Sequence, residues 1–310
     1  MRKKVLIIAK PWQGGLHTYY FNAFSRVKDF DVEIIFSYPE NLYQYFLYKQ
    51  NKRHWFNNLR NKINSNKYDI GFFINFNPAL RDLENTNKNI LYLTDKPNFD
   101  QIDIDFFSQI YISDLGYIDS VSYLKNYVSE LPFGFDPSIH FKFKNTKQKK
   151  LICSIINQDV RRDNWLDLMN KNNSFPYIYG NYYLKHKLFF QHPLKIKPPV
   201  AFNRQYEIYA NYEISLNIHA NILKKGTNMR TFEASGCMVP QLIEASPGID
   251  NYFEPDREIL IFSSIEEYTA KLNLLKNNPK IRKKIALNAF KRANDQHSYD
   301  KRVDLIIRNL

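Results

Sequence analysis

The chain has 310 residues, which is long enough for two domains of ordinary size. It contains 44 Lys and Arg against 31 Asp and Glu, so its formal net charge is +13. Aromatic residues make up 16% of the chain, and because disordered chains are poor in aromatics, this composition excludes disorder over most of the length.

The first part of the chain alternates apolar runs with helical or mixed segments. Residues 4–9 are predicted to form a strand, because the continuous apolar run from Val5 to Ala9 is typical of a strand buried on both faces of a parallel sheet. A turn is predicted at 11–15, followed by a helix with Tyr19, Tyr20, Ala23 and Phe24 on one face. Residues 41–64 are predicted to be helical, and further strands are predicted at 32–36, 68–74, 89–93, 109–112 and 127–131. This alternation indicates βαβ units.

Residues 132–137, which hold two prolines, and the basic residues 142–150 break the pattern and predict a linker. The alternation then restarts, with strands predicted at 150–156, 175–179, 214–218, 239–243 and 259–262. Helices are predicted at 163–170, 207–211, 229–236, from 279 onward and after 298. The fold class is therefore α/β, with two Rossmann-like, doubly wound parallel-sheet domains and a C-terminal helical extension. We expect domains at 1–140 and 141–296, with a helix at 297–310 that packs back on the first domain.

The loop after the first strand is one candidate site. Gly14 and Gly15 lie just before a helix, where open α/β sheets bind ligands, and adjacent glycines allow close approach of a ligand to the backbone. The sequence lacks the Gly-x-Gly-x-x-Gly pattern of dinucleotide-binding domains, and a tight turn that needs positive φ is the alternative. His17, in the same loop, is a candidate acid or base.

A second candidate site lies at residues 219–236, which follow a buried strand and lead into a helix. Asn228 and Arg230 stand at the start of that helix, where backbone N–H groups, the helix dipole and an arginine suit a phosphate. Glu233, one turn later, could accept hydrogen bonds from both hydroxyls of a ribose. The alternative is an ordinary helix with Arg230 and Glu233 in solvent and three residues in the core: Met229, Phe232 and Cys237.

Several stretches of the second half resemble, in order and spacing, the C-terminal half of the GT-B glycosyltransferases of the CgeB (spore-maturation) type, which are glycosyl transferases group 1-like. They are residues 215–219 (SLNIH), 228–237 (NMRTFEASGC), 247–255 (PGIDNYFEP), 258–262 (EILIF) and 297–303 (HSYDKRV). Residues 131–140 (LPFGFDPSIH) are similar to the interdomain segment of these enzymes. The resemblance is specific over the last third of the chain and diffuse before residue 131.

The resemblance implies the GT-B fold, with a nucleotide-sugar donor held by the C-terminal domain in the cleft between the domains. Glu233 would bind the ribose, and Asn228, Met229 and Arg230 would lie along the diphosphate. The donor would be linked to UDP, GDP or dTDP, and no further cofactor is expected.

Arg161 and Arg162, which follow the first strand of the second domain, would add positive charge at the diphosphate. The acceptor would dock on the N-terminal domain near the 14–17 loop. His17 and His219, the latter closing the first matching stretch, are the candidate catalytic residues.

No metal is expected, because GT-B enzymes stabilise the leaving diphosphate with helix dipoles and basic side chains. An Asp-x-Asp triplet at 103–105 lies in the first domain and is interpreted as surface. One position departs from the family pattern. Many retaining GT-B enzymes carry a glutamate eight positions before the one that matches Glu233, and this sequence has Lys225 there. The donor sugar and the stereochemistry therefore stay open.

The favoured function is a metal-independent glycosyltransferase whose acceptor is a glycan, a cell-surface polymer or modified nucleic acid. The alternatives are a catalytically inactive GT-B-fold protein that binds an anionic partner such as nucleic acid, and a nucleotide-sugar epimerase. The basic balance suggests an anionic acceptor and contact with an anionic membrane face, whereas Lys spread evenly by codon bias would explain it equally well.

The two cysteines, Cys153 and Cys237, lie far apart without a Cys/His cluster. This spacing argues against a zinc site or a disulfide scaffold and fits a reducing cytosol. The sequence has no run of 18 apolar residues and no recognisable signal peptide. We therefore expect a cytoplasmic protein, with peripheral membrane contact as a variant of that expectation.

Overall fold

The structure is a computed structural model, which describes residues 2–11, 14–75, 86–94, 97, 99, 102–120, 124–143, 150–182, 189–192 and 194–310. The chain forms two compact units: unit 1 comprises Met1–Pro132 and Tyr299–Leu310, and unit 2 comprises Phe133–Ser298. The predicted turn at 11–15 and the predicted basic linker at 142–150 lie in part at residues 12–13 and 144–149, outside the described residues.

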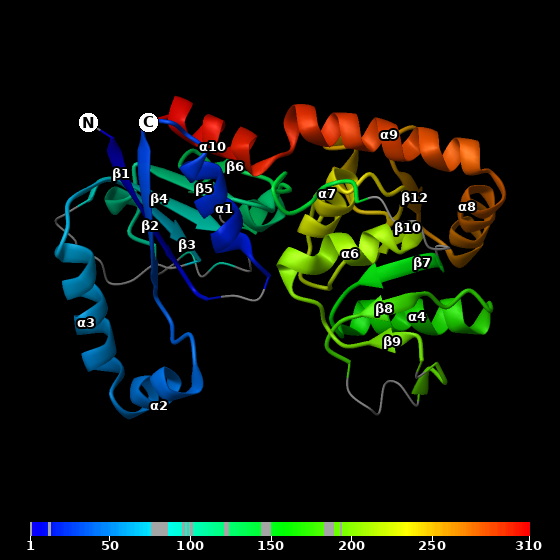
Figure 1. Ribbon diagram of the computed structural model, residues 1–310, viewed down its shortest axis with the longest axis horizontal. Coiled ribbons are helices and arrows are strands. Elements are labelled where there is room, and N and C mark those ends of the chain that lie inside the picture. The colour runs from blue at the N-terminus through cyan, green and yellow to red at the C-terminus, as the bar shows by residue number, and fades with distance from the viewer. Residues whose placement is uncertain are drawn as a thin grey trace. The chain divides into compact units, whose positions relative to one another are not determined.

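Unit 1 is built on a six-stranded sheet in the order β2-β1-β3-β4-β5-β6, with parallel pairing throughout (Figure 1). Its strands are β1 (Lys3–Ala9), β2 (Phe30–Phe36), β3 (Tyr68–Ile74), β4 (Thr86–Leu93), β5 (Gln109–Ile112) and β6 (Val128–Glu130). Its helices are α1 (Leu16–Ser25), α2 (Leu42–Gln50), α3 (Lys52–Asn64) and α10 (Tyr299–Arg308), with 3-10 turns at Ile104–Phe106 and Leu115–Ser120. The order reverses at β1, which leaves a topological switch point between β1 and β3.

The last helix completes the core of unit 1. Tyr19 and Tyr20 of α1 are fully buried, and the Tyr299 ring packs on both, with ring centroids 5.2 Å and 5.0 Å away. An ion pair of 2.6 Å joins Arg26, which follows α1, to Asp300 at the start of α10. Helix α10 therefore covers the apolar face of α1 that the sequence predicts.

Unit 2 repeats the plan with a parallel sheet in the order β12-β11-β10-β7-β8-β9. Its strands are β7 (Lys150–Ile155), β8 (Tyr177–Tyr179), β9 (Ile196–Lys197), β10 (Tyr212–Asn217), β11 (Gln241–Glu244) and β12 (Leu260–Phe262). Its helices are α4 (Val160–Lys171), α6 (Gln205–Ala210), α7 (Met229–Gly236), α8 (Ile265–Asn277) and α9 (Pro279–Gln296), with 3-10 turns at Phe202–Arg204 and Ile249–Asn251. The switch point of this sheet lies between β7 and β10.

Close packing at Gly236 fixes the start of unit 2. A Cβ at Gly236 would stand 2.4 Å from the ring of Phe135, so the ring lies directly against the backbone of α7. The backbone N–H of Phe135 donates to the carbonyl of His297, at 3.0 Å. Because residues 135–140 pack in this way, the chain passes from unit 1 to unit 2 after Pro132 rather than after residue 140. It returns to unit 1 after Ser298.

The predicted fold class is confirmed: both sheets are parallel and doubly wound, and helices close the chain. Two elements were not predicted, the short strand β9 and helix α8. The helical segment predicted at 41–64 is two helices, because Asn51 ends α2 and caps α3, accepting from the N–H of His54 at 2.9 Å. Helix α4 begins at Val160, before the predicted start, because Asp159 caps it.

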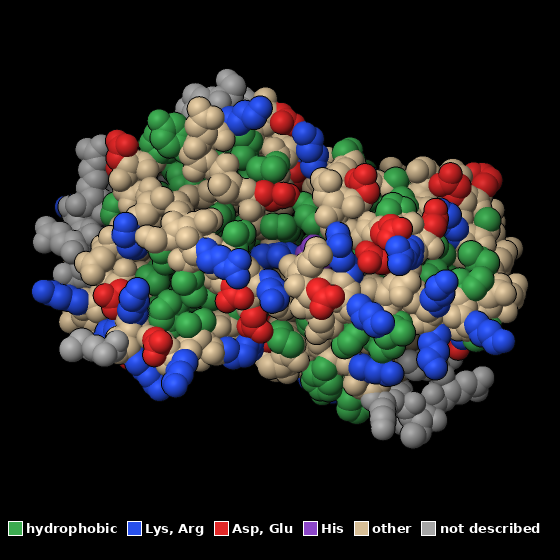
Figure 2. All heavy atoms as spheres, turned by 90° about the horizontal axis from the view of Figure 1, so that it is seen from above, with side chains coloured by type: hydrophobic (Ala, Val, Ile, Leu, Met, Phe, Trp, Pro, Cys, Tyr) green, Lys and Arg blue, Asp and Glu red, His purple; other side chains and the backbone are tan. Residues whose placement is uncertain are grey.

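The surface charge is mixed. On the face drawn in Figure 2, Lys and Arg side chains are spread over the surface and interleaved with Asp and Glu. Cys153 and Cys237 are buried and form no disulfide. Among the described residues, no helix is both long and apolar enough to cross a membrane.

Candidate functional site

The first group of candidate residues gathers where β7 and β10 end, at the switch point of unit 2. Asp159 accepts from the N–H of Arg161 at 3.0 Å and from that of Asn221 at 3.1 Å and 3.2 Å. One carboxylate therefore caps α4 and also holds the loop that follows β10.

Arg161 and Arg162 are both fixed at this edge of the sheet. The Nε of Arg162 donates to the carbonyl of Ile218, at 3.0 Å. The Nε of Arg161 donates to Oε1 of Glu244, at 2.7 Å, while Oε2 of Glu244 accepts from the N–H of His219, at 2.9 Å. Two cationic groups are thus held beside His219 by hydrogen bonds that also join β10 and β11.

The geometry around His219 determines which of its ring nitrogens carries the proton. Oδ1 of Asn228 accepts from the backbone N–H of Arg230, so the other amide atom of Asn228 is the nitrogen, which can only donate. That nitrogen lies 3.4 Å from Nδ1 of His219, so Nδ1 accepts and Nε2 carries the hydrogen. Among the described residues, Nε2 of His219 has no hydrogen-bond partner, although the side chain is fully buried.

His219 is a neutral imidazole at physiological pH. Burial lowers its pKa to about 3, and the positive charges of Arg161 and Arg162 act in the same direction. A buried N–H donor without a partner costs about 1–3 kcal/mol, and in native proteins such a group calls for an explanation in terms of a ligand, a water or an ion.

The side chains at the start of α7 are already hydrogen-bonded or buried, which the sequence does not indicate. The side chain of Asn228 caps the helix and exchanges two hydrogen bonds with the amide of Asn217, at 2.9 Å and 3.0 Å. The side chain of Met229 is buried. These two residues can therefore offer a phosphate backbone N–H groups at the helix N-terminus, but not their side chains.

Glu233 lies inside unit 2 and not in solvent. Its carboxylate is 0% exposed, and Oε2 pairs with the guanidinium of Arg230, which also donates to Gln205. Oε1 lies 3.7 Å from Nε2 of His140, a histidine whose pKa is lowered to about 3 by burial and by the charge of Arg230. Met229, Phe232 and Cys237 are buried, as the alternative interpretation of this helix expects, but that interpretation is wrong in placing Glu233 in solvent.

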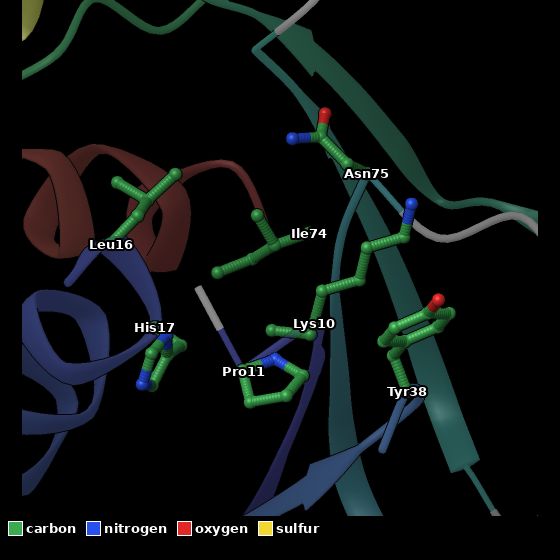
Figure 3. A pocket seen from close by; sticks show the side chains of 8 residues that line it. Lys10, Pro11, Leu16, His17, Tyr38, Ile74 and Asn75 are labelled. Carbon is green, nitrogen blue, oxygen red and sulfur yellow. The ribbon is translucent and has the colours of Figure 1, made fainter. Parts of the chain in front are cut away.

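A second group of candidate residues surrounds a cavity of about 250 Å³ in unit 1 (Figure 3). It lies at the carboxyl ends of β1, β2 and β3, which is the switch point of that sheet. The residues that line it are Ala9, Lys10, Pro11, Leu16, His17, Tyr38, Ile74 and Asn75. Figure 3 shows the Lys10 chain extending beside Tyr38, and the ammonium lies 6.0 Å from the centre of that ring.

Of the predicted residues in unit 1, only His17 lines the cavity. Burial lowers the pKa of His17 from its usual value, and its ring packs edge-on against Phe36, with centroids 5.2 Å apart. Gly15 has φ of 81° and precedes α1, so this position needs the left-handed conformation that glycine adopts most easily. Gly14 and Gly15 are not among the lining residues.

Three residues of the unit 2 site were missed by sequence reasoning: Asp159, Glu244 and His140. Glu244 ends β11 and accepts from Arg161, Trp165 and the backbone of His219. A carboxylate directly after a buried strand of a parallel sheet was a usable signal for it. His140 closes the 131–140 stretch, yet nothing local in the sequence places it beside Glu233.

The described residues contain no group of three or more His, Cys, Asp or Glu side chains arranged to hold a metal ion. The triplet at 103–105 lies in unit 1, at the 3-10 turn Ile104–Phe106.

Residues 161–308 match a protein family described as glycosyl transferase-like. Sucrose-phosphate synthase from Thermosynechococcus elongatus is similar in structure, with a TM-score of 0.68 at 8% identity over 99% of this chain and 98% of that one. HepE of Anabaena, in complex with UDP, gives 0.65 at 10% identity, over 99% of this chain and 100% of that chain. T4 phage BGT in complex with UDP-glucose gives 0.59 at 14% identity, over 99% of both chains. The sequence matches none of the curated proteins compared with it.

These likenesses show the fold. Two parallel-sheet domains of the Rossmann type with closing helices constitute the GT-B fold, and the predicted fold is confirmed in this finer form as well. The matched family segment begins at Arg161 and therefore contains the candidate residues of unit 2 except Asp159 and His140.

Proposed function

We propose that the protein is a glycosyltransferase that moves a sugar from a nucleotide-sugar donor to an acceptor hydroxyl, with the donor bound by unit 2. The family match over residues 161–308 and the GT-B fold both support glycosyl transfer. HepE and BGT, which share the fold, hold UDP and UDP-glucose, so uridine nucleotides are the first donors to test. We also propose that the enzyme is of the CgeB type and that its donor is linked to UDP, GDP or dTDP.

The observation that carries the proposal is the buried Nε2–H of His219, which lacks a partner among the described residues. It lies beside Arg161 and Arg162 at the switch point of the unit 2 sheet. A neutral N–H donor with two fixed cations nearby suits an oxygen of the donor diphosphate. His219 would stabilise the charge that develops there as the sugar leaves, together with the backbone at the start of α7 near Arg230.

Glu233 would bind the ribose hydroxyls, as the family resemblance implies. Because its carboxylate is buried and paired with Arg230, the nucleotide would have to displace that guanidinium. Arg230 is the more exposed member of the pair, with 20% of its side chain accessible, so it is the partner able to swing toward the diphosphate. The hydrogen bond between Glu233 and Arg230 would then be replaced by a hydrogen bond between Glu233 and the ribose.

The cavity of unit 1 would receive the acceptor, with His17 as the base. Since burial keeps His17 neutral at physiological pH, its imidazole can take the proton of the acceptor hydroxyl. The acceptor oxygen then bonds to the anomeric carbon of the sugar, the bond from that carbon to the phosphate oxygen breaks, and the nucleoside diphosphate leaves. The net charge of +13 and the Lys10 ammonium at the cavity favour an anionic acceptor.

The test is calorimetric titration with UDP, GDP and dTDP, followed by an assay of transfer from the matching sugar nucleotide. Arg162→Ala should weaken nucleotide binding by about 10-fold to 100-fold, since a charge-assisted contact is lost. The matched control is Lys284→Ala, which removes an exposed cation of the same unit. If no nucleotide binds the wild type, or if Arg162→Ala and the control bind equally well, the donor site is not where we place it.

Metal independence is tested separately. We expect transfer to continue in excess EDTA, because Arg161, Arg162 and the α7 N-terminus supply the positive potential that a divalent ion supplies in other transferases. Activity that is lost on chelation and returns with Mg²⁺ or Mn²⁺ would overturn this part of the proposal and leave the donor site itself in place.

A further inference from the structure

Helix α2 carries apolar side chains on both of its sides. On one side Tyr45 and Tyr48 pack toward the rest of unit 1, and the ring of Tyr48 lies 6.0 Å from Trp55 and 6.3 Å from Phe56 of α3. Tyr38, between β2 and α2, adds a ring contact with Tyr48 at 5.1 Å. The packing of α2 on its neighbours therefore needs only this side of the helix.

The opposite side of α2 is apolar and accessible. Its residues are Leu42, Tyr43, Phe46 and Leu47, with exposed fractions of 87%, 72%, 58% and 41%. Their spacing of three and four residues places them on one face of the helix, which we call the α2 face. No residue of α2 is buried, so the apolar residues of this face contribute little to the core of the unit. An apolar face gathered on one helix marks an interaction surface, whereas single exposed leucines do not.

The segment that forms α2 and α3 carries charge of one sign, and Glu40, before the start of α2, is the acidic residue nearest to it in sequence. Residues 42–64 contain five basic residues and no Asp or Glu: Lys49, Lys52, Arg53, Arg60 and Lys62. This composition differs from the face drawn in Figure 2, where basic and acidic side chains are interleaved. The ammonium of Lys49 lies 5.4 Å from the ring of Tyr45, and that of Lys52 lies 5.7 Å from the ring of Tyr48. Both rings belong to the packing side of α2. Lys49, three residues after Phe46 and seven after Leu42, lies where that side meets the α2 face.

Aliphatic and aromatic side chains on one face, bordered by lysine and arginine, are the composition of helices that lie in the interface of a membrane. Nucleic acid would use the cations and could stack on the rings, but it offers nothing to Leu42 and Leu47. A protein partner would need an apolar groove with an acidic rim to match both features of this surface. The acyl region of a bilayer accounts for the leucines, and anionic headgroups account for the cations.

We propose that α2 and the first turn of α3 form a membrane-docking element for bilayers that contain anionic lipids. The α2 face enters the boundary between headgroups and acyl chains, and Lys49, Lys52 and Arg53 bind the headgroups. This inference concerns unit 1 alone and does not depend on the proposed transfer reaction. If that reaction takes place, docking would bring the acceptor cavity of unit 1 to acceptors carried on a membrane.

The test is sedimentation of the full-length protein with vesicles, either of phosphatidylcholine alone or mixed with about 30% phosphatidylglycerol. We expect partitioning onto the mixed vesicles to exceed that onto neutral vesicles by about 100-fold, from roughly fivefold for each of the three cations Lys49, Lys52 and Arg53. The triple variant Lys49→Glu, Lys52→Glu, Arg53→Glu should lose this preference. A second variant, Leu42→Ser with Phe46→Ser, should lower partitioning onto both kinds of vesicle by at least about tenfold.

The chain offers matched controls. Lys280→Glu, Lys283→Glu and Lys284→Glu change the net charge by the same amount on exposed positions of α9, and Leu194→Ser removes an exposed leucine elsewhere. Both controls should sediment like the wild type. All the substituted side chains are accessible, so unchanged melting temperatures will show that the variants are folded.

Two results would overturn the proposal. One is equal sedimentation of wild type, α2 variants and controls with the mixed vesicles. The other is binding to single-stranded RNA that requires Lys49, Lys52 and Arg53 while vesicles are not bound, which would assign the surface to nucleic acid. Failure of nucleotide binding would leave the docking result unaffected, so the two proposals can fail separately.

Discussion

The carboxyl edges of the two sheets share a topology and differ in chemistry. In both units the strand order reverses beside the first strand of the unit, and the candidate residues lie at that reversal. In unit 2 the edge is crossed by charged and amide hydrogen bonds that link Arg161, Glu244 and His219. In unit 1 it surrounds a cavity whose lining is largely apolar, with Lys10 and His17 as its ionisable groups. The topology therefore determines where a ligand site lies, and the side chains determine what the site can do.

The two edges also differ in how rigidly their charged side chains are held. The unit 2 edge is preorganised, because Arg161 and Arg162 are fixed before any ligand arrives and lose little freedom on binding. The unit 1 edge places an ammonium on a long flexible chain beside Tyr38, which suits ligands of varied shape. A fixed edge fits an invariant diphosphate, and an adaptable edge fits an acceptor.

The largest expected effect tests whether the two fully buried histidines of unit 2 stay neutral as the pH falls. His140 and His219 have pKa values lowered to about 3 in the folded protein, against 6.5 in an unfolded chain. Below pH 6.5 the unfolded chain takes up protons that the folded one does not, so stability present above that pH is lost as the pH falls toward 3. At pH 5 the loss should be about 2 kcal/mol for each histidine and about 4 kcal/mol together.

The measurement is urea unfolding at pH 7 and pH 5, with hydrogen exchange to assign the loss to a unit. His140→Asn keeps an acceptor for the backbone N–H of Asp136 and should flatten the pH dependence by half. His54→Asn, at an exposed position of α3, is the control and should not change it. Equal acid sensitivity of all three proteins would mean that the two histidines are accessible to protons in the folded state.

The second prediction concerns the unit 1 edge. His17→Ala should lower kcat of the transfer reaction by about 100-fold or more, because general base catalysis contributes at least that much. The affinity for the nucleotide, measured by calorimetry, should stay as in the wild type, since His17 belongs to unit 1. His54→Ala serves as the control in the same unit. Loss of nucleotide affinity with an unchanged kcat would reverse the roles that we give to the two edges.

The smallest predicted effect concerns Glu233. Glu233→Ala should weaken nucleotide binding by about 1–3 kcal/mol through the loss of charge-assisted bonds to the ribose. Glu207→Ala is the matched control, since Glu207 pairs with Arg204 at the same i,i+3 spacing on a more accessible helix. Because Glu233 is buried, Glu233→Gln provides a second variant that keeps the volume. Wild-type affinity in a folded Glu233→Gln protein would make this residue structural only.

Much of the fold could be predicted because parallel strands that are buried on both faces consist of continuous apolar runs. Residues 5–9 and 70–74 are such runs, and both lie in strands of unit 1. Strand β9 has two residues, too few for any periodicity. Helix α8 did leave a signal that was missed, since Ser264 and Glu267 have the capping-box spacing. Ser264 Oγ accepts from the N–H of Glu267, at 3.2 Å, and Glu267 Oε2 accepts from the N–H of Ser263, at 2.7 Å.

Less of the candidate site could be predicted. The Arg161–Arg162 pair and His219 were identified by residue type and position, and the structure brings them to one edge of the sheet. The burial of Glu233 could not be foreseen, because it depends on His140 and Gln205, which are distant in sequence. The sequence at the start of a helix indicates which of its groups could face a ligand. It does not indicate which residues from distant parts of the chain pack against those groups.

The position of α10 has a consequence for how the chain folds as it is synthesised. Tyr19 and Tyr20 are made early, but Tyr299 and the rest of the helix that covers them emerge only after every residue of unit 2. The ribosome therefore releases all of unit 2 before unit 1 can close its core. The unit that begins the chain is completed last, and until then its aromatic face is open to chaperones or to aggregation.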